Sequence, residues 1–258
     1  MKLPGIKKTI SRKQIFKLLG VIALFTLSVL GFILYNYMTP DIQKKSFFKE
    51  VEPTNTEYVI PKNKLNNKNG SKEYSFSIWL RVNNWYNQTS SQNGSEKNIF
   101  SYGSKDTDAS HENVVPSIWL DNEKNDLNIY VQTIQGSNQP IKVKNIPLKK
   151  WFKLTVVMTR KSVQVFINSK LDVFTFLKGD IIIPNGDVYL FTGDSKIDGQ
   201  FAHFIYYKQA LSPAEVTKLY TVGDRPTKKS LLYLFVNLFT NMGKYRNDKQ
   251  IKKNCHTC

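Results

Sequence analysis

The stretch Asp198-Gly-Gln-Phe-Ala-His-Phe-Ile-Tyr-Tyr-Lys-Gln-Ala-Leu-Ser-Pro-Ala-Glu-Val-Thr-Lys-Leu-Tyr220 decides the fold. Its first half is rich in aromatic residues and predicts a strand. Its second half predicts a helix, because Ser212 suits the N-cap, Pro213 the first helical position and Glu215 the third. An apolar stripe follows at Val216, Leu219 and Tyr220. We therefore expect a strand that leads into a short closing helix.

Four segments before this stretch carry apolar residues at every second position. These positions are Tyr74, Phe76, Ile78, Leu80 and Val82; Leu127, Ile129 and Val131; Phe152, Leu154, Val156 and Met158; and Val163, Val165 and Ile167. Successive side chains of a strand point to opposite faces, so each segment predicts a strand with one buried and one solvated face. Turn-forming pairs such as Asn93-Gly94 and Asn185-Gly186 lie along the same region. The pattern predicts an all-β, two-sheet antiparallel sandwich.

Several segments resemble the laminin-G-like, or concanavalin A-like lectin/glucanase, superfamily. Residues 76–82 resemble the first long core strand of the family, and residues 150–157 with 163–168 resemble its central hairpin. Residues 198–220 match most closely, because a family strand runs there into Ala-Leu-Ser-x-x-Glu-Ile and a short closing helix. The resemblance covers about residues 57–224 and implies a jelly-roll sandwich.

Residues 18–38 contain no charged side chain and are almost wholly apolar or aromatic. At about 1.5 Å per residue, a helix of this length spans the roughly 30 Å of bilayer hydrocarbon. Residues 1–17 carry six basic residues and no acidic one, which keeps the N-terminus in the cytosol. We therefore predict a single-pass signal-anchor protein. The lipid bilayer is then a partner, and the chain from Asp41 onward lies at the cell surface, in a lumen or on a virion membrane.

Two other interpretations of residues 18–38 are weaker. The apolar core of a cleaved signal peptide is usually shorter, about 7–15 residues, and ends in a small-x-small cleavage site that is missing here. A helix buried in a protein core usually has a polar face, and none interrupts this run.

The sequence divides into five parts. These are a basic cytosolic N-terminus (1–17), the transmembrane helix (18–38), a stalk (39–56), the sandwich (57–224) and a basic, apolar tail (225–258). We expect residues 41–73 to run from the stalk into the first edge strand of the domain. The formal net charge of +17 is concentrated in the two flanks. A nucleic-acid-binding domain would carry its basic residues on the folded face, so we expect no nucleic-acid partner.

No catalytic cluster is evident. Glucanases of this fold use paired carboxylates spaced along one strand, and the required Glu-x-Asp-x-x-Glu pattern is absent. His111, His203 and His256 lack a supporting nucleophile motif, and the alternation of His203 with Phe201 and Ile205 indicates a partly buried strand residue. We expect no enzyme.

Calcium is the one candidate cofactor, because many related sandwiches bind it at the strand ends. Asp121, Asn122 and Asp126 cluster in one predicted turn. Turns favour Asp and Asn for backbone reasons alone, which is the alternative explanation.

The candidate ligand-binding residues lie in two predicted loops. Trp85 and Tyr86 stand beside amide side chains, a mixture that stacks on sugar rings, and Asp106 and His111 belong to the next loop. The alternative is that Trp85 covers a sheet edge.

Two kinds of modification are also predicted. Asn69, Asn87 and Asn93 each begin an Asn-x-Ser/Thr glycosylation sequon. Cys255 and Cys258 form a terminal Cys-x-x-Cys, which we interpret as a local disulfide or free thiols, since a lone pair supplies only two metal ligands.

The tail contains the apolar run 231–239 between basic residues. Residues 230–243 are uncharged but reach only about 21 Å as a helix, too short for a second span. The run is either an interfacial segment on the membrane or an apolar strap on the sandwich or a partner.

The expected function is non-enzymatic binding of a glycan or a protein. The main alternative is a structural protein that tethers a membrane to a coat, since the Lys/Asn-rich composition and plain anchor-plus-sandwich plan resemble envelope proteins of large DNA viruses. A glycoside hydrolase is a distant third.

Overall fold

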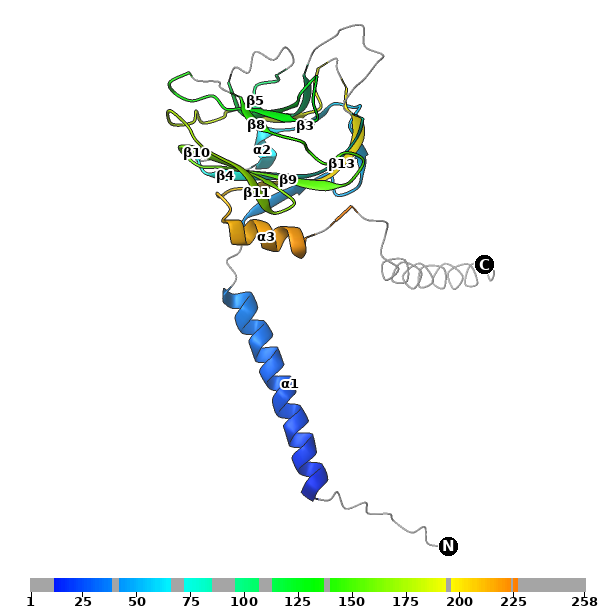
Figure 1. Cartoon of the computed structure of the whole chain (residues 1–258). Helices are drawn as coiled ribbons and strands as arrows, with labels where there is room; N and C mark the ends of the chain where they lie inside the picture. The colour runs from blue at the N-terminus through cyan, green and yellow to red at the C-terminus, as the bar shows by residue number, and fades with distance from the viewer. Residues whose placement is uncertain are drawn as a thin grey trace, which may run out of the picture. The chain divides into compact units, whose positions relative to one another are not determined.

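The computed structural model in Figure 1 describes eight stretches of the chain. They are residues 12–38, 42–65, 72–84, 96–106, 113–136, 140–193, 196–223 and 225–226, and the side chains of residues 14–15 and 32–38 are not described. The chain forms two compact units, Met1–Ile42 and Gln43–Cys258.

The first unit contains one helix, α1 (Arg12–Met38), of 27 residues. It contains no proline, the residue that would remove one of its backbone hydrogen bonds. Among its described residues, Leu24, Phe25 and Leu27 are exposed by 70%, 68% and 65%. Within the part of the chain that the structure describes, no helix meets the length and apolarity required to cross a membrane.

The second unit is a sandwich of two sheets. The seven-stranded sheet has the order β1 (Lys44–Phe47), β13 (Asp198–Tyr207), β4 (Tyr74–Asn84), β9 (Phe152–Met158), β10 (Ser162–Ile167) and β11 (Lys170–Phe176), with β2 (Glu52–Pro53) also on β13. The six-stranded sheet has the order β3 (Tyr58–Ile60), β12 (Asp187–Leu190), β5 (Lys97–Gly103), β6 (Val114–Leu120), β7 (Leu127–Tyr130) and β8 (Ile141–Val143). All pairings between these strands are antiparallel, which confirms the predicted two-sheet architecture.

The core lies between the two sheets. It contains every alternating apolar residue predicted in segments 74–82, 127–131 and 152–158, and from β10 it contains Val163 and Val165, with the partly buried Ile167 packed against it. Aromatic rings fill its centre: Phe76 lies 5.2 Å from Phe100 and 5.5 Å from Phe204, between ring centroids.

A second layer covers part of the outer face of the seven-stranded sheet. Helix α3 (Pro213–Thr221) lies against this face (Figure 1), and Ser75, Ser77 and Trp79 are at most 3% exposed. The expectation that this face of β4 would be solvated is therefore wrong, because strand alternation reports which residues share a face and not what covers it.

Part of the predicted stalk belongs to the sheet. Residues 44–47 pair with β13 from Lys44 opposite Tyr207 to Phe47 opposite Phe204, and residues 52–53 form β2 on the same strand. A short helix, α2 (Lys62–Leu65), follows β3 and buries Leu65 completely.

Candidate functional site

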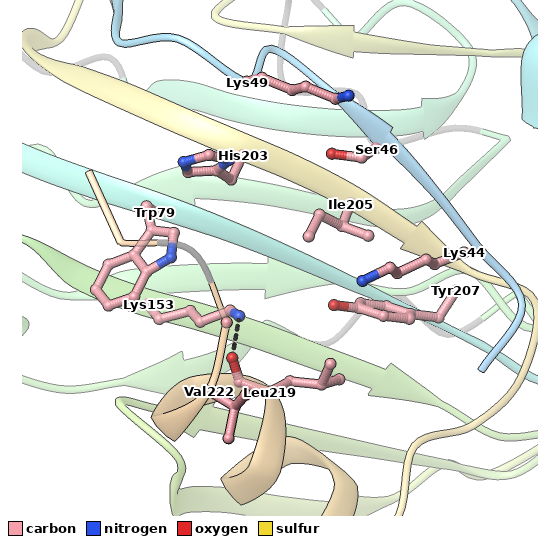
Figure 2. Close-up of a pocket in the computed structure, with 11 residues that line it drawn as sticks. Lys44, Ser46, Lys49, Trp79, Lys153, His203, Ile205, Tyr207, Leu219 and Val222 are labelled. Carbon is pink, nitrogen blue, oxygen red and sulfur yellow. Dashed lines mark hydrogen bonds between the residues drawn. The ribbon is translucent and has the colours of Figure 1, made fainter. Parts of the chain in front are cut away.

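A pocket of about 390 Å³ lies between the outer face of the seven-stranded sheet and α3. Figure 2 shows its residues arriving from five elements: β1, β4, β9, β13 and α3. We call it the α3 pocket. Its walls bring together segments that are more than 150 residues apart in the sequence, since β1 and α3 contribute Lys44 and Leu219.

An irregularity of β13 shapes one wall. The register between β13 and β4 shifts between Ala202 and Ile205, and His203 has a φ of 49°. The His203 amide donates to the carbonyl of Phe48 at 2.6 Å, and Phe48 itself has a φ of 53°. The bulge places His203 and Ile205 at the pocket. Backbone strain of this kind is concentrated at functional sites, which favours a functional role for the β13 bulge.

Helix α3 forms the opposite wall and is held by its cap. The Ser212 side chain accepts from the Glu215 amide, and the Glu215 carboxylate accepts from the Ser212 amide at 2.7 Å, which confirms the predicted capping box. Val216 is 2% exposed against the sheet, and the ring of Tyr220 stacks on Trp79 at 5.8 Å. The last turn of the helix thereby reaches the pocket with Leu219.

Lys153 connects the sheet to the helix. It stands opposite Trp79 in the β4–β9 register, and its Nζ lies 5.9 Å from the centroid of the Trp79 ring. The same Nζ donates to the carbonyl of Leu219 at 3.1 Å, near the negative end of the α3 dipole. Although it is charged, Lys153 is only 4% exposed. These contacts hold its ammonium group at the pocket wall (Figure 2).

Cationic and neutral polar groups dominate the polar lining. Lys44 and Lys49 approach from β1 and the residues after it, and both are exposed. With Lys153 and His203 they make four basic side chains at the pocket, and Ser46 and Tyr207 add two hydroxyl groups to the lining. Among the lining residues that the structure describes, none carries a carboxylate.

The hydroxyl of Tyr207 makes no hydrogen bond of normal geometry within the described part of the chain, although the residue is fully buried. The nearby Ser77 hydroxyl likewise makes no hydrogen bond of normal geometry with the described residues. Burial raises the pKa of Tyr207 and the nearby Ser77 hydroxyl partly lowers it, so the phenol is protonated at neutral pH and serves as a donor. Buried polar groups are rarely left unsatisfied, so this hydroxyl is a candidate donor to a ligand in the pocket.

A sequence comparison agrees with this architecture. A family model described as concanavalin A-like lectin/glucanases superfamily matches residues 53–217, which is more than half of the chain. The chain belongs to the concanavalin A-like lectin/glucanase superfamily. No curated protein matches the sequence.

Solved structures of the same fold include toxin domains. One is the binding domain of botulinum neurotoxin DC in complex with rat synaptotagmin II, with a TM-score of 0.51 at 15% identity over 72% of this chain and 48% of that one. Another is the ligand binding domain of botulinum neurotoxin serotype D in complex with N-acetylneuraminic acid, with a TM-score of 0.52 at 13% identity over 69% and 46%. The chain therefore spans about half of each, and at this identity the likeness concerns the lectin-like fold alone.

Of the four ligand residues predicted from the sequence, the structure describes Asp106, which does not line the α3 pocket. Trp85, Tyr86 and His111 lie outside the described residues. Asp106 is 2% exposed, its carboxylate accepts from the Ser117 hydroxyl at 2.8 Å, and its carbonyl accepts from Thr192. Asp106 thus ties a loop to the lectin-like sandwich through internal hydrogen bonds.

The predicted calcium residues are engaged in turn geometry. Asp121 accepts from the amides of Glu123 and Lys124, and Asp126 accepts from the Asn145 amide at 2.7 Å. Burial alone would raise the pKa of Asp121, but these amides and Asn128 outweigh it, so the pKa is lowered. Asn122 also has an interaction partner. In the described stretches, no group of three or more His, Cys, Asp or Glu side chains is placed to hold a metal ion.

The remaining predicted positions, Asn69, Asn87, Asn93, Cys255 and Cys258, lie outside the described residues. Sequence reasoning missed the α3 pocket itself. The one local signal was the positively charged Lys44–Lys49 segment, which was assigned to the stalk.

Proposed function

We propose that this protein is a membrane-anchored, non-enzymatic recognition protein that binds a glycan in the α3 pocket. The observation that carries the proposal is the pocket, which is lined by four basic side chains and two hydroxyl groups. Ile205 and Leu219 add apolar surface to this polar set. Sites for small ligands combine apolar walls with a few convergent polar groups, and sugars require both.

The fold neighbours support a binding role. One of them is a ligand binding domain solved with N-acetylneuraminic acid and another is a binding domain solved with a synaptotagmin, and this chain matches about half of each. Function depends on sites and not on folds, so the proposal rests on the pocket of this chain. Glycosidases need two carboxylates at the scissile bond, and the cationic lining described above favours binding over hydrolysis.

The anchor in this proposal is the stretch 18–38. It lacks charged residues, and the helix α1 runs through all of it. Large exposed apolar side chains such as Leu24 and Phe25 are stabilised by transfer from water into lipid. The basic residues before the helix favour a cytosolic N-terminus, with the sandwich on the other side.

Binding is tested with the full-length chain in lipid nanodiscs on a glycan array. Ser46→Trp should fill the α3 pocket and abolish binding. Lys45→Trp is the matched control, because it changes the adjacent exposed residue of β1, which points to the opposite face. Binding that persists in Ser46→Trp, or the absence of any glycan bound by the wild type, would refute the proposal.

The anchor is tested by making the chain in the presence of microsomes. We expect the sandwich to resist added protease until detergent opens the vesicles, and the chain to stay with the membrane in alkaline carbonate. A sandwich that is digested without detergent, or a chain released by carbonate, contradicts the topology.

A further inference from the structure

The positive charge of the α3 pocket has a geometric basis. The β1–β13 register places Lys44 directly opposite Tyr207, and both line the pocket. Opposed residues of neighbouring strands have Cβ atoms about 4.5–5.5 Å apart, so an ammonium and a phenol approach the same space. Figure 2 shows both polar ends directed from their strands toward the middle of the pocket.

A second cationic group, the ammonium of Lys153, reaches the pocket from β9. The Lys153 ammonium is oriented by the Leu219 carbonyl and by the Trp79 ring. His203, displaced by the bulge, stands on the same outer face of β13 as Ile205 and Tyr207. A small anionic group in this space would therefore meet cations from β1 and from β9.

The Tyr207 hydroxyl supplies an independent indication. It is a buried donor without a hydrogen bond of normal geometry in the described part of the chain, and the Ser77 hydroxyl that influences its pKa is itself unsatisfied. A donor in this state costs free energy in the unbound protein, and an oxygen acceptor on a ligand would relieve that cost. Charge-assisted hydrogen bonds to an oxyanion are the strongest of this kind, and oxyanions are also what lysine ammonium groups attract.

We propose that the α3 pocket takes an oxyanion group, either a carboxylate or a sulfate, carried by an acidic sugar. Lys44 and Lys49 attract the charge, Lys153 contacts it from the sheet, and the Tyr207 hydroxyl donates to one of its oxygens. The inference rests on the proposed glycan-binding function and names the chemical class of the ligand.

The test measures the affinity of the full-length chain in nanodiscs for matched oligosaccharides that carry a carboxylate, a sulfate or neither. We expect both acidic forms to bind at least tenfold more tightly than the neutral form, and added salt to weaken them. Inorganic sulfate should raise the thermal midpoint of the ligand-free protein above its value in sodium chloride of equal ionic strength. A preference for one acidic form identifies the oxyanion.

Two pairs of variants locate the effect. Tyr207→Phe should weaken acidic glycans about tenfold, since it removes one charge-assisted hydrogen bond, without lowering the thermal midpoint. Tyr206→Phe is its control, because that hydroxyl is also buried and without a partner in the described stretches but belongs to the core between the sheets. Lys44→Glu should weaken acidic glycans similarly, and Lys144→Glu, an exposed lysine that is not among the described lining residues, should not.

The outcomes separate the two proposals. Equal affinity for neutral and acidic glycans, or acidic binding that Tyr207→Phe leaves unchanged, overturns the oxyanion site while glycan recognition stands. If no glycan binds but inorganic sulfate still stabilises the wild type and not Tyr207→Phe, the oxyanion site stands and the glycan function fails. If neither glycan nor sulfate has an effect, both proposals fail.

Discussion

The N-cap of α3 controls one wall of the pocket, and its contribution can be measured. In the Ser212→Ala variant the Glu215 amide loses its side-chain acceptor, while the Ser212 amide keeps the Glu215 carboxylate at 2.7 Å. Because half of the capping box survives, we expect a loss of about 1 kcal/mol, within the usual 0.5–2 kcal/mol for such caps. For a folded unit of this size the thermal midpoint should fall by roughly 2–4 °C.

The helix should remain docked in this variant. Val216 is buried against the sheet and Tyr220 stacks on Trp79, and neither contact involves the cap. Urea unfolding followed by tryptophan fluorescence measures the loss of stability. Ser212→Gly is the matched control and should cost only a few tenths of a kcal/mol, since glycine is itself a good N-cap. Equal stability of the wild type and Ser212→Ala, or a larger loss in the glycine variant, would refute the assignment of this cap.

Three further changes test other parts of the sandwich. In Gly223→Ala the new Cβ would lie 2.2 Å from the Leu219 carbonyl oxygen, so the last turn of α3 must shift; we expect a loss of about 1–3 kcal/mol in urea unfolding, together with weaker glycan binding. The hydrogen bond from Arg160 holds the pKa of Asp180 below its ordinary value, so its stabilisation is present above about pH 4 and is lost as the pH falls through the lower folded pKa. Asp180→Asn should therefore lower the urea midpoint at pH 7 but differ little from the wild type at pH 2, and a constant difference would exclude this linkage. Phe76→Ala removes a ring that is 1% exposed and should cost about 3–5 kcal/mol by the same measurement; a loss under 1 kcal/mol would contradict its central place in the core.

The sandwich was predictable because its evidence is local. Alternation along residues 74–82 and 152–158 assigns one set of side chains to the core, and the structure buries that set. The capping box needs only four consecutive residues, 212–215, to be recognised. Both signals depend on spacing along the chain, which is fully visible in a sequence.

An edge strand after the stalk was expected, but alternation could not place it at Lys44–Phe47. Lys44–Phe47 is a polar, lysine-rich segment, and most of its residues are exposed because the strand lies at the edge of the sheet. Its strand character comes from hydrogen bonds to β13, whose residues lie more than 150 positions later. Charged residues are common on edge strands because they discourage pairing with other chains, so polarity alone does not distinguish such a strand from a stalk.

The α3 pocket was missed because of one extra residue in β13. Simple alternation places Phe201, His203 and Ile205 on the same face, and the partly buried strand position predicted for His203 is confirmed. The bulge at His203 breaks that alternation: Phe201 and Phe204 face the core, whereas Ile205 and its neighbour two residues on, Tyr207, line the pocket. A bulge reverses the face of every residue on one side of it, and no residue type marks it reliably when the positive φ belongs to a histidine. The strained backbone at His203 and the position of Tyr207 at the pocket are therefore linked, since without the bulge the side chain of residue 207 would share a face with Phe201.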